Sequence, residues 1–168
     1  RNFSLLKKNV EINNYKNIVL INKAVSNKSG KVKLFLSEDN LGGHHLRKYG
    51  DYKNYTVVES IMLDKFFENN NGRIDFIKMD IEGSEAAAIK GMKKILKKNK
   101  KLKLITEFSV ARITGFGMKP EEYLKTLMME FKLFYINEKN KKLIPVTEKD
   151  FSDICNGRKE WPNFLCVR

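Results

Sequence analysis

The stretch from residue 74 to residue 108 constrains the fold more than any other part of the sequence. Residues 74–80 form an apolar-rich run of strand length, residues 84–98 repeat apolar side chains at helical spacing, and residues 102–108 form a second strand-like run. Two strands joined through a helix run parallel in one sheet, because the helix carries the chain back to the starting edge. The sequence therefore predicts an α/β fold with a mostly parallel sheet.

Shorter elements flank this unit on both sides. Residues 27–30 carry turn-forming Asn, Ser and Gly, and Pro120 suits the first turn of a helix. A chain of 168 residues fits a single domain. The patterns predict helices over residues 3–13, 63–69 and 120–130, strands over residues 18–25, 31–37, 55–61, 132–136 and 163–167, and a hairpin end near residues 143–146, with the last strand antiparallel.

The composition favours a globular protein over a disordered or membrane-spanning one. Apolar residues make up 42% of the chain, which suffices for a core, and no run of about 18 apolar residues occurs. The net charge of +13 rests on 27 Lys against 6 Arg, whereas nucleic-acid readers rely on Arg and exposed aromatic residues. We therefore interpret basic clusters such as residues 97–101 as solvated surface, and expect neither a membrane nor nucleic acid as a partner.

The two cysteines, Cys155 and Cys166, lie near the end of the sequence. Their spacing is not that of a metal-binding pair, and two cysteines with two histidines make a poor zinc set. Cys166 sits in an apolar strand and is expected to be a buried small hydrophobe. Reduced thiols indicate a cytoplasmic setting.

Ligands of parallel α/β sheets bind beyond the carboxyl ends of the strands. Three residues stand at or near such ends: Ala24, Asp80 and Glu107. Asp80 and Glu82 also flank the tight turn between the strand and the helix of the first unit, so both carboxylates are expected to face this crevice.

The same turn carries a family resemblance. Residues 76–85, FIKMDIEGSE, resemble the signature of the FkbM family of S-adenosylmethionine (SAM)-dependent methyltransferases, a strand ending in Asp-x-Glu-Gly-x-Glu. The resemblance covers most of residues 3–135. Its other parts, in chain order, are Leu5–Val10, Ile18–Ser26 followed by Gly30, the Gly42–Leu46 loop, Val57–Leu63 before Asp64, and Leu104–Glu107.

This resemblance implies a Rossmann-like class I methyltransferase sheet, SAM as cofactor, and transfer of a methyl group to a hydroxyl of a small molecule or glycan. It also implies a glycine-rich turn and an acidic strand end for the cofactor, and neither is found in this sequence. The first residue is Arg1 rather than Met. We therefore expect residues 1–168 to be a truncated domain whose N-terminal strands are missing, with an exposed sheet edge that would favour a homodimer.

Several residues can be given roles in such a reaction. Asp80 is expected to contact the methionine portion of SAM or the acceptor, and Glu82 to act as a base or an orienting carboxylate. The alternative for both is a helix cap. Glu107 would share the acceptor pocket with Asp80, or else form a salt bridge with Lys78 or Arg112.

His44 and His45 lie in a glycine-flanked loop, and His44 is the candidate base, although a solvated loop histidine is the alternative. No ligand spacing supports a metal site with Asp80 and Glu107, so none is predicted. Ala24 and Val25 would border the adenine of SAM or simply pack the core.

Trp161 could line the acceptor pocket or pack the last strand. Two other functions stay open beside the methyltransferase. One is a non-catalytic α/β module that serves a structural or partner-binding role, and the weaker one is a basic nucleic-acid-associated protein.

Overall fold

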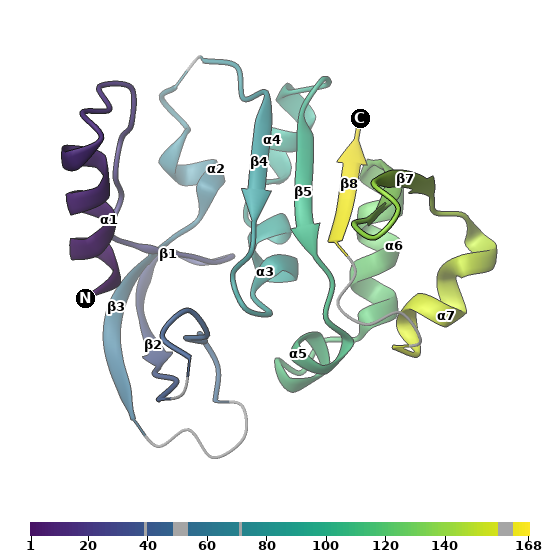
Figure 1. The fold of residues 1–168 in the computed structure, drawn as a ribbon, viewed down its shortest axis with the longest axis horizontal. Helices are drawn as coiled ribbons and strands as arrows, with labels where there is room; N and C mark the ends of the chain where they lie inside the picture. The colour runs from purple at the N-terminus through teal and green to yellow at the C-terminus, as the bar shows by residue number, and fades with distance from the viewer. Residues whose placement is uncertain (39, 49–53, 71, 158–162) are drawn as a thin grey trace.

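The computed structural model describes residues 1–38, 40–48, 54–70, 72–157 and 163–168, which form two sheets with helices around them (Figure 1). The smaller sheet has the order β1-β3-β2. β1 runs parallel to β3, and β2 is antiparallel to β3 across the loop that holds both histidines. Its strands are β1 (Ala24–Val25), β2 (Gly30–Phe35) and β3 (Tyr55–Ile61).

The larger sheet has five strands in the order β4-β5-β8-β6-β7. β4 and β5 are parallel, whereas β8 lies antiparallel between β5 and β6, and β7 forms a hairpin with β6. The strands are β4 (Phe76–Met79), β5 (Lys103–Glu107), β6 (Lys132–Asn137), β7 (Lys142–Pro145) and β8 (Asn163–Val167).

This sheet is mixed, and the prediction of a mostly parallel sheet is wrong. The helical crossover makes only β4 and β5 parallel neighbours, because β8 returns from the opposite direction and inserts between β5 and β6. The prediction of an antiparallel last strand is confirmed. Since β8 opposes both of its neighbours, β4, β5 and β6 share one direction, and the carboxyl ends of β4 and β5 meet at one edge.

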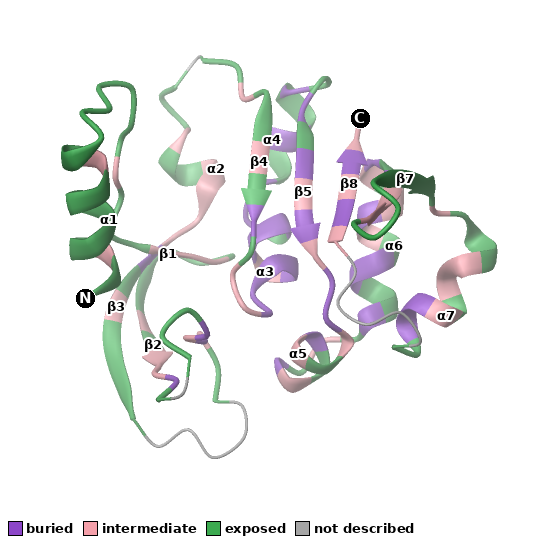
Figure 2. Ribbon diagram, in the orientation of Figure 1, coloured by how far each residue is buried: buried purple, intermediate pink, exposed green. Residues whose placement is uncertain are grey.

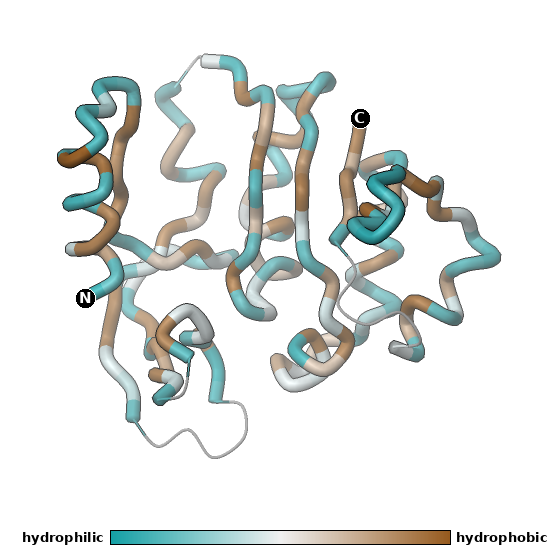
Figure 3. Tube along the Cα trace, viewed as in Figure 1, coloured by the Kyte–Doolittle hydropathy of each residue, from teal (hydrophilic) through white to brown (hydrophobic). Residues whose placement is uncertain are grey.

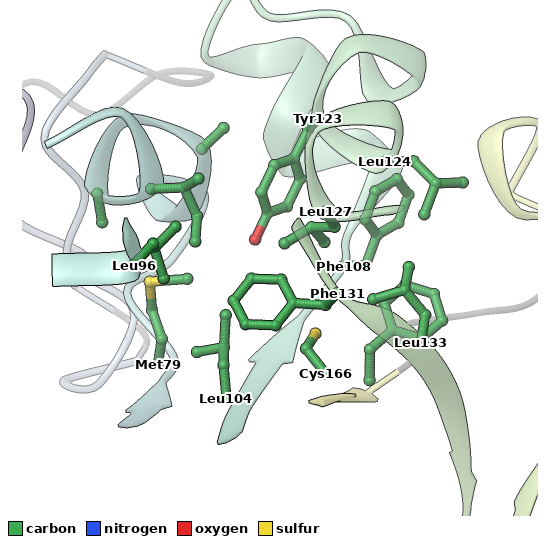
Figure 4. Close-up of a cluster of buried hydrophobic side chains, with 14 of the residues drawn as sticks. Met79, Leu96, Leu104, Phe108, Tyr123, Leu124, Leu127, Phe131, Leu133 and Cys166 are labelled. Carbon is green, nitrogen blue, oxygen red and sulfur yellow. The ribbon is translucent and has the colours of Figure 1, made fainter. Parts of the chain in front are cut away.

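The core lies between this sheet and the helices behind it in Figure 1. α6 (Pro120–Glu130) begins at Pro120 as predicted and buries Tyr123, Leu124 and Leu127. The Tyr123 side chain points from the helix toward the sheet (Figure 4). The Tyr123 hydroxyl lies 3.1 Å from the Thr106 hydroxyl, which gives both buried oxygens a hydrogen-bond partner.

The predicted single helix over residues 84–98 is two helices in the structure, α3 (Glu85–Lys90) and α4 (Lys93–Lys98). They are separated at Gly91, where the backbone just after β1 comes close. A Cβ on Gly91 would stand 2.5 Å from the Ser26 carbonyl oxygen. Only glycine allows this approach.

The N-terminus of α4 is capped by a residue from another helix. The Asp64 carboxylate accepts hydrogen bonds from the backbone N–H groups of Lys94 and Ile95, both at 2.9 Å. The Asp64 N–H in turn donates to the Gly91 carbonyl at 2.9 Å. Asp64 belongs to α2 (Leu63–Phe66), so the break in the helix joins α2 to α4.

The N-terminal region is far less buried than the rest. α1 (Asn2–Ile12) has no buried residue, and only Ala24 and Val25 of the predicted strand over residues 18–25 pair with another strand. Figure 3 shows apolar positions along α1 and the segment after it, which Figure 2 colours mostly as exposed. Val19, for example, is 84% exposed.

Three short helices complete the described structure: α5 (Val110–Gly115), the 3-10 helix η1 (Glu148–Asp150) and α7 (Phe151–Cys155). No helix in the described part of the chain is long and apolar enough to cross a membrane.

Both cysteines are free and buried, which confirms the prediction for Cys166. Burial raises the pKa of Cys155 to about 11 and that of Cys166 to about 12, so both thiols stay protonated near neutral pH.

Candidate functional site

The turn after β4 holds the acidic residues of the sequence motif. The buried Glu85 carboxylate accepts a hydrogen bond from the Ile81 N–H at 2.9 Å and closes the turn. Glu82 has a φ of 58°, a left-handed conformation that costs free energy for a residue with a Cβ. Ser84 is the N-cap residue of α3, but its side chain makes no capping hydrogen bond.

Arg112 joins this turn to the end of β5. Its Nη1 atom lies 2.5 Å from Glu82 Oε2 and 2.8 Å from Glu107 Oε2. The three side chains are only 15–18% exposed. Arg112 is positioned by α5, whose N-cap residue Ser109 accepts a hydrogen bond from the Arg112 N–H. One guanidinium therefore holds two carboxylates from the ends of neighbouring parallel strands.

The pKa of Glu107 is raised above its ordinary value. Burial is the main cause, and the negative charges of Asp80 and Glu82 raise it further, while Arg112 lowers it. Burial also raises the pKa of Glu85. Glu107 therefore takes up a proton more readily than an exposed glutamate would, which suits a general base.

Asp80 stands at the carboxyl end of β4, as the sequence indicated. Its side chain is 54% exposed and pairs with Lys78 at 3.3 Å, whereas the Glu82 side chain points toward Arg112. Asp80 lies near enough to Glu107 for its charge to raise the pKa of Glu107. The structure thus brings Asp80, Glu82 and Glu107 to one edge of the sheet, but with only Asp80 open to solvent.

The two histidines differ in position. The His45 ring is buried, its Nδ1 lies 3.2 Å from the Glu82 carbonyl oxygen, and the ring packs edge-on against Phe116. His44 instead accepts a hydrogen bond from the Ser37 N–H at 3.1 Å. His45, rather than the His44 chosen from the sequence, therefore contacts the backbone of the turn that carries Glu82.

Sequence reasoning treated Arg112 only as an alternative partner of Glu107 and did not choose His45. The distinction between the histidines comes from the pairing of Phe35 with His45, a contact that no local pattern in the loop indicates. For Arg112, the signal available was its position five residues after Glu107, within reach of the strand end.

The two residues proposed for the adenine lie in the smaller sheet. Ala24 pairs with Ser60 and Val25 with Ile61, and both side chains are partly buried. Their role at a cofactor, like that of the acidic residues, stays a prediction. Trp161 lies outside the described residues. Among the residues that are described, no group of three His, Cys, Asp or Glu side chains is placed to hold a metal ion.

Fold and site together define an α/β protein with a carboxylate site at the carboxyl ends of two parallel strands. The family model described as the methyltransferase FkbM domain matches residues 1–142, and the chain belongs to this family. The family match supports methyltransferase activity and confirms the resemblance found in the sequence. Comparisons with curated proteins and with solved structures give no match.

Proposed function

We propose that this domain transfers a methyl group from SAM to a hydroxyl oxygen of a small molecule or glycan. The observation that carries the proposal is the pair of carboxylates, Glu82 and Glu107, that Arg112 holds at the carboxyl edge of β4 and β5. The common direction of β4, β5 and β6, with β8 reversed between the last two, supports a Rossmann-like methyltransferase sheet.

The charge of the site suits this cofactor. Asp80, Glu82 and Glu107 outnumber the two cations that pair with them, Lys78 and Arg112, which leaves a negative environment for a sulfonium and an ammonium group. Asp80, the solvent-open carboxylate, would hold the amino group of SAM, and Ala24 with Val25 would border its adenine. SAM, when bound, supplies the electrophilic methyl group.

The remaining chemistry belongs to the protein. The acceptor oxygen forms a bond to the methyl carbon as the sulfur–methyl bond breaks, and the hydroxyl proton must leave. Glu107 accepts that proton, because its raised pKa makes it a stronger base than an exposed carboxylate. Arg112 fixes the Glu107 carboxylate in place. Binding of the acceptor and the methyl donor side by side supplies the proximity that methyl transfer needs.

Cofactor binding is tested first, by thermal unfolding of the protein with S-adenosylhomocysteine. A ligand at 100 times its Kd stabilises by about 2.7 kcal/mol. Asp80→Asn should abolish most of this stabilisation. The matched control is Asp75→Asn, which removes an exposed carboxylate just before β4, paired with Arg73, and should leave it intact. Absence of any stabilisation would instead favour the non-catalytic module.

Catalysis is tested by release of S-adenosylhomocysteine with a panel of hydroxylated acceptors. Glu107→Gln keeps the shape and a hydrogen-bonding oxygen, and should lower kcat by about 10²–10⁴-fold while the protein still binds the cofactor. Glu130→Gln disrupts another Glu–Arg pair, Glu130 with Arg168 at 3.0 Å, and should leave kcat unchanged. Equal kcat for Glu107→Gln and wild type would remove Glu107 from the mechanism.

A further inference from the structure

A pocket of about 300 Å³ lies beside the candidate site, between the smaller sheet and α3. This volume is at the lower end of the range for small-molecule sites. Segments that are distant in sequence build its wall: the chain after β1, the histidine loop, α3, and the loop between α5 and α6. Its lining includes Leu46, Arg47, Ser84, Phe116 and Met118.

Ser84 supplies a hydroxyl that has no hydrogen-bond partner within the described structure. The residue is 3% exposed and lines the pocket. A buried hydroxyl without a partner is costly, and such groups in native proteins are normally satisfied. Because this oxygen is almost wholly buried, a ligand oxygen in the pocket would satisfy it once the Ser84 side chain rotates toward the pocket.

Arg47 supplies a cation to the same wall. Its guanidinium packs on the backbone of the α5–α6 loop: a Cβ on Gly117, which has a φ of +69°, would stand 2.7 Å from Arg47 Nη1. No carboxylate of the described residues forms an ion pair with Arg47, and the described lining contains no acidic residue. As far as the described residues go, the pocket therefore offers positive charge and hydrogen-bond donors without a competing anion.

The pocket also adjoins the carboxylate site. Phe116 lines the pocket and packs edge-on against the His45 ring, whose Nδ1 lies 3.2 Å from the Glu82 carbonyl oxygen. Ser84 follows Glu82 by two residues in the turn after β4. A ligand held by Arg47 and Ser84 thus lies beside the turn that carries Glu82, against the apolar side chains of Leu46, Phe116 and Met118.

We propose that this pocket binds the oxyanion group of the methyl acceptor, so that the acceptor is a hydroxylated small molecule bearing a carboxylate or a phosphate ester. Arg47 pairs with the oxyanion, the hydroxyl of Ser84 donates a hydrogen bond to it, and the carbon skeleton packs against Phe116 and Met118. This assignment of the acceptor class rests on the proposed methyl transfer, but the anion site itself does not.

The test is titration calorimetry of the whole protein with glucose 6-phosphate, glucuronate and glucose at low ionic strength. The two anionic sugars distinguish a phosphate from a carboxylate, and glucose reports binding without an anion. We expect at least one anionic sugar to bind at least tenfold more tightly than glucose. Arg47→Gln should weaken that binding at least tenfold, and Ser84→Ala should weaken it severalfold.

The matched control is Arg73→Gln, which removes an exposed arginine before β4, outside the pocket, and should leave the affinity unchanged. The proposal would be overturned if glucose bound as tightly as the anionic sugars, or if Arg47→Gln and Arg73→Gln weakened binding of the anionic sugar equally. Displacement of the anionic sugar by S-adenosylhomocysteine would also overturn it, because the pocket would then belong to the cofactor.

The two proposals fail separately. Arg47-dependent sugar binding in a protein that S-adenosylhomocysteine does not stabilise supports the anion site and contradicts methyl transfer. Stabilisation by S-adenosylhomocysteine without Arg47-dependent sugar binding contradicts the anion site alone. Should Arg47→Gln unfold, Arg47→Lys provides a second variant, which keeps the charge but loses the planar fork of donors and should weaken sugar binding severalfold.

Discussion

Arg112 is the residue on which the geometry of the carboxylate site depends. It holds Glu82 and Glu107 together at an edge where three carboxylates meet and only a little solvent reaches the pair. Removing one partner of a buried ion pair leaves the other charge buried and uncompensated. The free energy lost in this way is larger than the net stabilisation that the intact pair provides. Arg112 thus serves the fold as well as the position of the proposed base.

Arg112→Gln should therefore lower the free energy of unfolding by about 3 kcal/mol, measured by urea denaturation at neutral pH. Arg73→Gln is the control: it breaks an exposed pair with Asp75 and should change the free energy by less than about 0.5 kcal/mol. If both variants lose less than about 0.5 kcal/mol of unfolding free energy, Arg112 does not stabilise the turn.

Glu85 gives a second residue-scale prediction, through pH. Burial raises the pKa of its carboxyl above the ordinary value near 4.5, so the folded state binds the proton more tightly than the unfolded state. The resulting stabilisation is fully present below the ordinary pKa and is lost as the pH rises through the folded-state pKa. Glu85→Gln keeps an oxygen for the Ile81 N–H but cannot ionise.

The wild type should therefore lose more unfolding free energy between pH 5 and pH 8 than Glu85→Gln does. Denaturant unfolding of both proteins at the two pH values measures this, and the other titrating groups cancel in the comparison. Parallel pH profiles would show that Glu85 ionises in the folded protein as it does in water.

At the scale of elements, the break between α3 and α4 is the feature most sensitive to a single methyl group. Gly91→Ala should destabilise by about 1–3 kcal/mol, because its Cβ would overlap the Ser26 carbonyl oxygen. Thermal unfolding measures it. Gly42→Ala is the control, since its nearest neighbour is the flexible, exposed Asn40 side chain at 3.3 Å, and it should be nearly neutral.

The elements that the sequence predicted well are those whose pattern is complete within themselves. α6 carries its own start signal and its own apolar face, and β5 alternates buried and less buried residues over its length. The helix over residues 84–98 was predicted as one because its break depends on Asp64 and Ser26, which are distant in sequence. Residues 18–25 look like a strand, but most of them find no partner strand in the described structure.

The candidate site divides in the same way. Asp80 and Glu107 were found because a strand end is visible in the sequence. The choice of His45 over His44 depended on a bridge to Phe35, and the side to which Glu82 turns depended on α5, which no pattern predicted. Residue types could be predicted, whereas side-chain directions required the tertiary structure.

The molecule as a whole is stabilised unevenly. Among the residues that the structure describes, the buried hydrophobic ones all lie from Met79 onward, and α1 buries nothing. Local opening should therefore cost little free energy in the N-terminal region and nearly the full unfolding free energy in β5 and β8. Native-state hydrogen exchange should show α1 amides exchanging orders of magnitude faster than those of β5, and equal protection would contradict this division.

The position of β8 has a consequence for how the protein is made. β8 fills the place between β5 and β6, yet it is synthesised after every other strand of its sheet. While the chain emerges from the ribosome, β5 and β6 each present a row of unpaired backbone groups where β8 will lie. The larger sheet is thus able to close only once residues 163–167 have left the exit tunnel, which makes its assembly a late event and leaves two unpaired strand edges open to aggregation until then.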